Sequence, residues 1–230
     1  MPTPLPASLL LDMPAGRQDP VPTLVLAPGA SYHLRKPLMD RLARVLCERG
    51  IAVLRFNWAY LDVTPKGAPS DDLSVELAEL QAVIAFARDD ARLRTDRLVV
   101  AGKSMGSVVA ARAFAADALL AGAVLLTPLL SQPGAAPLAT TDGAERYYGE
   151  LRADHRPSLL VSGDQDPYCD PRDLHRFATA STAAMRVAVV DGDHGFGTPG
   201  LTGDAADAAL ARSHDVVARR VADFMDTAFG

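Results

Sequence analysis

The chain has 230 residues, of which 49% are hydrophobic, so it is long enough to bury a substantial core. Its net charge of −5, without any basic stripe carrying interleaved aromatic residues, argues against a nucleic-acid binder. Its two cysteines, Cys47 and Cys169, are too few for a disulfide framework and lack metal-ligand spacing, so we expect ordinary buried thiols in a reducing compartment.

The predicted elements begin with two strands, at residues 7–12 and 23–27, separated by a turn rich in proline and glycine. Residues 23–27 are apolar without alternation, which is typical of a parallel strand covered by helices on both faces. A loop at residues 28–37 leads into a helix that ends at Gly50. The apolar residues of this helix recur at helical spacing: Leu38, Leu42, Val45 and Leu46.

A strand at residues 51–56 and a second amphipathic helix follow. We expect Ser70 to cap this helix, because Asp71 and Asp72 come next and suit its positive end. The apolar positions again have helical spacing: Leu73, Leu77, Leu80 and Ile84.

The next strand, residues 97–101, leads directly into a G-x-S-x-G motif. This motif runs from Gly102 to Gly106 and is typical of a nucleophile elbow, in which Ser104 sits on a strained turn between strand and helix. Such a match occurs by chance in roughly one chain in ten of this length. The apolar strand before it and the alanine-rich helix predicted up to Ala116 favour the elbow over a surface turn.

The remaining chain continues the alternation of strands and helices, which indicates a doubly wound, mostly parallel α/β sheet flanked by helices on both faces. We expect a single domain over residues 1–230, with one small variable segment at residues 128–156. The strands are predicted at residues 122–127, 158–162 and 186–190, and the helices at residues 144–153, 171–180 and 205–224.

Three loops carry reactive side chains directly after apolar strands, in the order Ser104, Asp166, His194. In a doubly wound sheet such loops meet at the carboxyl edge, so we expect these side chains to lie together. Asp164 competes with Asp166, since either is able to cap its turn. Among the five histidines, His194 follows the last strand within a glycine-flanked turn.

With these motifs in this order, the chain resembles the α/β-hydrolase superfamily over nearly its whole length. Within the superfamily it is similar to the small, lid-poor dienelactone-hydrolase-like members. It also resembles, more narrowly, the group of testis-expressed and NSL-complex-subunit hydrolase-like proteins. One departure is the loop that begins Pro28-Gly29-Ala30, where many relatives have His-Gly.

The resemblance implies that Ser104 attacks an acyl carbonyl, that His194 transfers the proton and that Asp166 orients His194. It implies an oxyanion hole made by the backbone N–H groups of Met105 and Ala30, and no metal or cofactor. The implied function is a serine hydrolase for a small ester or thioester. A peptidase-like hydrolase with the same triad and a non-catalytic binding module in a protein complex are the alternatives.

The substrate pocket is less well defined by the sequence. Trp58 and Tyr60 either form an apolar pocket wall near Ser104 or pack in the core, and His33 either lines the pocket or faces solvent. Tyr147 and Tyr148 either cover the site or form one face of a short helix, and we assign no chemistry to Lys103 within the elbow.

No export signal is visible at the N-terminus, and the longest apolar run, residues 119–130, is about half the length needed to span a bilayer. We therefore expect a cytoplasmic protein that acts on a small acyl substrate, without nucleic-acid or membrane partners. The oligomeric state stays open.

Overall fold

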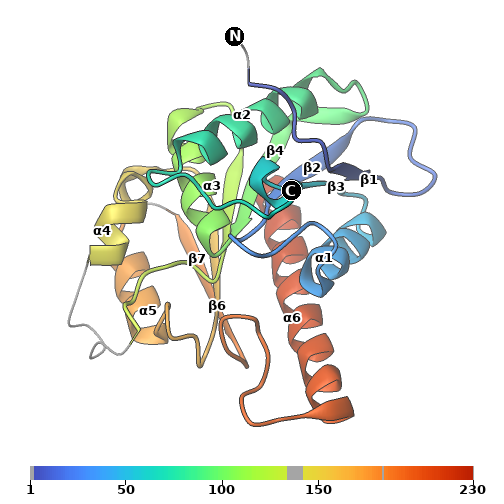
Figure 1. Cartoon of the computed structure of the whole chain (residues 1–230). Coiled ribbons are helices and arrows are strands. Elements are labelled where there is room, and N and C mark those ends of the chain that lie inside the picture. The colour runs from blue at the N-terminus through green and yellow to red at the C-terminus, as the bar shows by residue number, and fades with distance from the viewer. Residues whose placement is uncertain (1–2, 134–141, 183, 230) are drawn as a thin grey trace.

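The computed structural model describes residues 3–133, 142–182 and 184–229, and its centre is a seven-stranded sheet (Figure 1). The strand order is β1-β3-β2-β4-β5-β6-β7; β1 pairs antiparallel with β3, and the other pairings are parallel. The strands are β1 (Leu9–Asp12), β2 (Val21–Ala27), β3 (Ala52–Phe56), β4 (Leu93–Lys103), β5 (Gly122–Leu126), β6 (Ser158–Gly163) and β7 (Met185–Val190).

Helices cover both faces of this sheet, so the predicted doubly wound α/β class is confirmed. The helices α1 and α6 pack on one face, and α2, α3 and α5 pack on the other. The helical elements are α1 (Pro37–Glu48), 3-10 helix η1 (Ala59–Leu61), α2 (Ser74–Asp89), α3 (Met105–Ala116), α4 (Asp142–Tyr148), 3-10 helix η2 (Glu150–Ala153), α5 (Pro171–Thr179) and α6 (Gly203–Phe229).

The unbroken apolar run in β2 is explained by this two-sided cover. Leu24 and Leu26 face the core beneath α1 and α6, whereas Val25 and Ala27 face the core beneath α2 and α3. All four side chains are fully buried. Since successive strand residues point to opposite faces, a strand buried on both sides has no polar position to alternate with.

The start of α2 lies further along the chain than a cap at Ser70 predicts. The helix begins at Ser74, with Leu73 in the left-handed conformation at its cap position (φ 60°). The carboxylate of Glu76 accepts hydrogen bonds from both the N–H and the hydroxyl of Ser70. The Ser70 hydroxyl in turn accepts a hydrogen bond from the N–H of Val75, in the first turn of α2, at 3.4 Å. Ser70 therefore contacts the start of the helix as predicted, although α2 begins only at Ser74.

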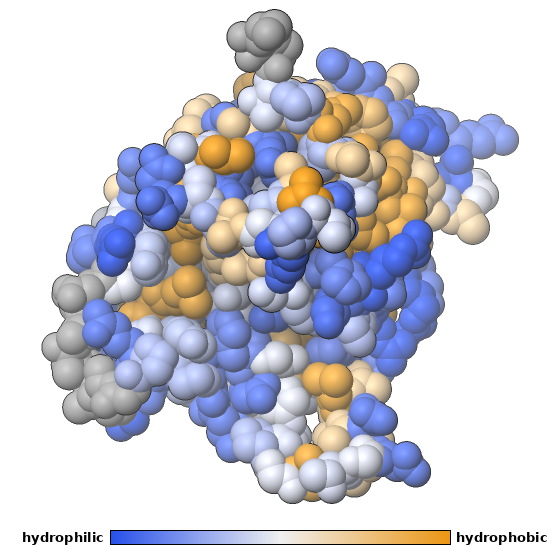
Figure 2. Space-filling model, in the orientation of Figure 1, coloured by the Kyte–Doolittle hydropathy of each residue, from blue (hydrophilic) through white to orange (hydrophobic). Residues whose placement is uncertain are grey.

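The variable segment at residues 128–156 contains α4 and η2, close to the single helix predicted at residues 144–153, and its residues 134–141 lie outside the described ranges. None of the helices within the described ranges is long and apolar enough to cross a membrane. On the face drawn in Figure 2, hydrophobic areas are separated by hydrophilic residues.

Candidate active site

Ser104 lies on a strained turn between β4 and α3. Its backbone has φ 54° and ψ −122°, a region that non-glycine residues rarely adopt. A Cβ at Gly102 would lie 2.0 Å from the carbonyl oxygen of Gly106, and a Cβ at Gly106 would lie 2.4 Å from that of Pro28. Only glycine fits at both positions, which is the physical reason for the spacing of the G-x-S-x-G motif.

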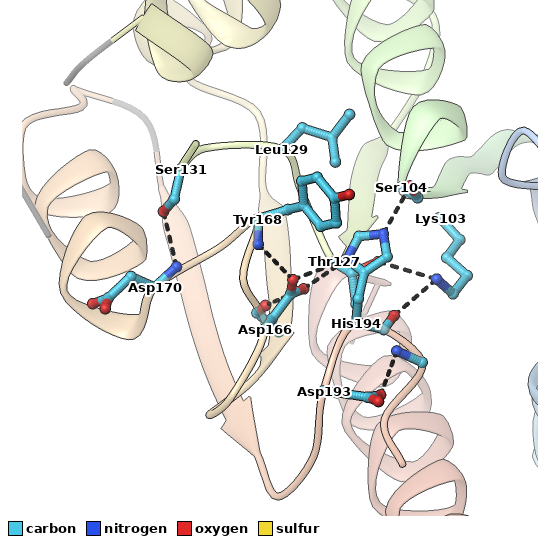
Figure 3. Close-up of polar contacts among 12 residues, drawn as sticks. Lys103, Ser104, Thr127, Leu129, Ser131, Asp166, Tyr168, Asp170, Asp193 and His194 are labelled. Carbon is cyan, nitrogen blue, oxygen red and sulfur yellow. Dashed lines mark hydrogen bonds and ion pairs between the residues drawn. The ribbon is translucent and has the colours of Figure 1, made fainter. Parts of the chain in front are cut away.

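A continuous hydrogen-bonded chain joins Ser104 to His194 and Asp166 (Figure 3). The Ser104 Oγ lies 2.9 Å from His194 Nε2, and His194 Nδ1 lies 2.9 Å from each carboxylate oxygen of Asp166. The structure thus brings together the three side chains that the sequence placed at one sheet edge. They come from the loops after β4, β6 and β7.

The carboxylate of Asp166 is fully buried and held by two further donors. The Ser162 hydroxyl donates to Oδ2 at 3.1 Å, and the backbone N–H of Tyr168 donates to Oδ1 at 2.9 Å. The competing Asp164 is exposed and accepts a hydrogen bond from the N–H of Gly192 at 2.8 Å. Asp164 therefore joins the two loops, while Asp166 faces the imidazole.

The loop that carries His194 is compact and close to the loop of Asp166. A Cβ at Gly163 would lie 2.1 Å from the carbonyl oxygen of Gly192, so the two backbones nearly touch. The Asp193 carboxylate accepts from the N–H groups of Gly195 and Gly197, the turn-forming role predicted for it. The Tyr168 ring packs against the imidazole with a centroid distance of 4.8 Å.

The loop between β2 and α1 lies against the nucleophile. A Cβ at Gly29 would be 3.5 Å from the Cβ of Ser104, so this loop approaches the site closely. No described residue accepts a hydrogen bond from the backbone N–H of Ala30 or of Met105. Both residues line the cavity beside Ser104.

Trp58, Tyr60 and His33 do not line the cavity, which corrects one of the two interpretations left open for each. Trp58 is fully buried, packs edge-on against Phe56 and donates from Nε1 to the Pro28 carbonyl at 2.9 Å. The Tyr60 hydroxyl donates to the Ala30 carbonyl at 3.0 Å, and His33 is exposed. Trp58 and Tyr60 therefore brace the β2–α1 loop from behind.

A cavity of about 1030 Å³ opens beside Ser104 and His194. Its apolar and aromatic walls include Tyr32, Leu129, Tyr147 and Tyr168, and Lys103 also lines it. Tyr147 thus borders the site, whereas the adjacent Tyr148 is buried in the core. Tyr32 and Tyr168 each lie two residues beyond a predicted site residue, a signal that sequence reasoning missed.

The described residues contain no group of three or more His, Cys, Asp or Glu side chains arranged to hold a metal ion. Both cysteines are free, and Cys169 is buried while Cys47 is only half-buried. Burial raises the pKa of Cys47 to about 11 and raises that of Cys169 further. Both thiols therefore stay protonated near neutral pH and are poor nucleophiles.

Comparisons with known proteins agree with this geometry. The sequence model of the alpha/beta hydrolase domain family matches residues 20–225. No curated protein sequence matches the chain.

Similar solved structures include Est1E from Butyrivibrio proteoclasticus, with 19% identity, a TM-score of 0.68, and coverage of 96% of this chain and 93% of that one. An alpha-beta serine hydrolase homologue from Coxiella burnetii has 18% identity and a TM-score of 0.70, with 95% and 94% covered. Dienelactone hydrolase from Anabaena variabilis has 16% identity and a TM-score of 0.67, with 95% and 90% covered. At these identities the likeness shows a shared fold.

Proposed function

The chain belongs to the alpha/beta hydrolase domain family, and from this premise we propose that it is a serine hydrolase that cleaves a carboxylic ester or thioester. The observation that carries the proposal is the unbroken chain of hydrogen bonds from Ser104 through His194 to Asp166. A serine hydroxyl is a weak nucleophile on its own and needs an adjacent base that is itself oriented by a third group. The three residues supply these roles.

In the proposed mechanism, Ser104 Oγ attacks the acyl carbonyl carbon while His194 Nε2 takes the hydroxyl proton. The resulting oxyanion accepts hydrogen bonds from the N–H groups of Met105 and Ala30. Collapse of this intermediate breaks the bond to the alcohol or thiol, which leaves with the proton from His194. Water then attacks the acyl-enzyme with the same base, which releases the acid and restores Ser104.

Asp166 supports this mechanism through its own partners. Its carboxylate accepts from Nδ1 of His194, which fixes the tautomer that leaves Nε2 free to accept the serine proton. The bonds from Ser162 and from the Tyr168 N–H hold the carboxylate in place before the reaction starts. Preorganisation of this kind avoids rearrangement during proton transfer.

The walls of the cavity favour substrates with an apolar or aromatic portion. Tyr32, Leu129, Tyr147 and Tyr168 surround the space beside Ser104. Ligand pockets usually have volumes of roughly 300–1,000 Å³, so this cavity has room for an acyl group or leaving group well beyond acetyl. Est1E, one of the similar structures, has been solved with ferulic acid bound.

The proposal is tested with p-nitrophenyl esters from acetate to octanoate. We expect Ser104→Ala to lower kcat/KM by at least about 10³-fold, because removal of a triad nucleophile leaves only binding and the oxyanion hole. Ser74→Ala, which changes an exposed serine on α2, is the matched control and keeps the wild-type rate. Hydrolysis that survives Ser104→Ala contradicts Ser104 as the nucleophile. A wild type that hydrolyses none of the esters contradicts the proposal and favours the binding-module alternative.

A further inference from the structure

Lys103 places a positive charge inside the protein, directly before the nucleophile. It is the last residue of β4, and only 4% of its surface is exposed. Burial of an ammonium group costs free energy unless other groups replace its hydration. A methionine or leucine would fill the same space without that cost, so the contacts of Lys103 deserve a functional explanation.

The contacts of the ammonium group join β4 to three loops of the site, and Figure 3 shows two of these contacts, with His194 and with Thr127. Nζ donates to the backbone carbonyl of His194 at 3.0 Å and to Thr127 Oγ1, just after β5, at 3.4 Å. It also lies over the Tyr32 ring, 5.0 Å from its centroid, in the β2–α1 loop. The shorter of the two hydrogen bonds therefore goes to the backbone of the residue whose imidazole contacts Ser104.

The ammonium makes no salt bridge with any carboxylate in the part of the chain that the structure describes. Asp166 and Asp193 act on it only through space. A simple ion pair thus does not account for its burial. Its shortest polar contact is a peptide carbonyl, and a charged donor makes that bond about twice as strong as a neutral one does.

We propose that Lys103 is a positioning residue whose ammonium group fixes the His194 loop through the His194 carbonyl, and so holds the imidazole between Ser104 and Asp166. This inference rests on the proposed hydrolase function. Within the described residues, the hydrogen bonds of Nζ go to the His194 carbonyl and to Thr127, and not to the side chains of Ser104 or His194. Lys103 acts through the backbone of His194, and a displacement of that imidazole by about 1 Å is enough to cost about 100-fold in rate.

The proposal predicts a pH dependence of activity, because the Lys103 ammonium group loses its proton only slightly above neutral pH. Burial lowers the pKa of Lys103 from 10.5 to about 8, although Asp166 and Asp193 act in the opposite direction. Other groups that act on the ammonium are the Tyr32 ring, the His194 carbonyl and, through space, His214 of α6, whose own pKa is lowered mainly by burial and further by Lys103. The Lys103 side chain is therefore mostly charged below about pH 8 and mostly neutral above it, where its hydrogen bond to the His194 carbonyl weakens.

The test compares pH profiles of kcat/KM from pH 6.5 to 10 for the wild type, Lys103→Met and Lys103→Arg. The control variant is Lys36→Met, which removes a lysine at the N-cap position of α1, where its side chain makes no capping hydrogen bond. We expect the wild type to lose activity severalfold above pH 8. Lys103→Met should lower kcat by about 10- to 100-fold with KM within about 3-fold, and should lack the alkaline decrease. Lys103→Arg should move that decrease to higher pH, because guanidinium keeps its charge.

Lys103→Met with wild-type kcat, or with the wild-type alkaline decrease, overturns the inference. If circular dichroism shows that Lys103→Met is unfolded, the test relies on Lys103→Arg. An alkaline decrease at the wild-type pH in folded Lys103→Arg then overturns the inference. These results are distinct from failure of the proposed function. The proposed function fails if Ser104→Ala keeps the wild-type rate or if the wild type hydrolyses no ester, and neither result involves a change at Lys103.

Discussion

At the scale of single residues, the site depends on groups that do not react. Asp166 is placed by the Ser162 hydroxyl and the Tyr168 N–H, and the Ala30 carbonyl is held by Tyr60. Such partners fix the position of each reactive atom before a substrate arrives, which is where most electrostatic catalysis comes from. The proposed roles of the triad can therefore be tested by changing the residue that orients His194 as well as by changing the nucleophile.

One such test is Asp166→Asn. We expect kcat to fall by about 10²- to 10⁴-fold with little change in KM, because an amide no longer enforces the tautomer in which His194 Nε2 accepts a proton. Steady-state hydrolysis of p-nitrophenyl butyrate measures this effect. Asp191→Asn, an exposed carboxylate at the end of β7, is the control. Equal rates for the two variants would exclude Asp166 as the residue that orients His194.

At the scale of elements, α4 is attached to the site by one buried side chain. The Tyr148 hydroxyl lies 2.8 Å from Ser107 Oγ in α3 and accepts from the N–H of Leu129 at 2.9 Å. The Ser107 hydroxyl also donates to the Ser104 carbonyl at 2.6 Å. Tyr148 therefore links α4 to the first turn of the helix after the nucleophile and to Leu129 in the cavity wall.

Tyr148→Phe should lower the free energy of unfolding by about 1–3 kcal/mol, because it leaves the Leu129 N–H without its acceptor. Tyr147→Phe is the matched change on the same helix, at a ring that is only half-buried, and should alter stability by less than about 0.5 kcal/mol. Urea denaturation of both variants measures the difference. Equal midpoints would show that the hydroxyl of Tyr148 does not anchor α4.

Strands were the elements that sequence predicted best. The apolar runs that became β2 and β5 are buried on both faces, and such runs have one simple interpretation in an α/β chain. The start of α2 was predicted only in part, because Ser70 accepts from the N–H of Val75 but the helix begins at Ser74, and the carboxylate of Glu76 in its first turn also holds Ser70. Cap residues depend on such side-chain contacts, which periodicity does not reveal.

At the scale of the whole molecule, topology brings the site together. The loops of Ser104, Asp166 and His194 all follow the carboxyl ends of neighbouring or near-neighbouring parallel strands, so order along the chain was enough to predict their meeting. The cavity walls could not be predicted in the same way. Trp58 points into the core and Tyr168 against His194, and these directions depend on three-dimensional packing.

The role proposed for Lys103 could not be predicted from the sequence either. Its position in the elbow is variable in the family pattern, so the motif assigns it no role. The only signal in the sequence is a lysine that follows the apolar strand residues 98–102 directly, at a position where a charged side chain has to find partners inside the protein. The partner, a backbone carbonyl 91 residues further along the chain, is visible only in the fold.

The most direct test of the central proposal is peptide mass spectrometry after treatment of the folded protein with a fluorophosphonate probe. We expect one probe per chain, located by fragment ions on Ser104 and not on Ser107 three residues later, because the hydroxyl of Ser104 is hydrogen-bonded to His194 Nε2 whereas that of Ser107 is bonded to the Ser104 carbonyl and to Tyr148. His194→Ala and heat-denatured protein should remain unlabelled. A folded wild type without the adduct on Ser104, or with the same labelling in His194→Ala, would contradict the proposed hydrolase.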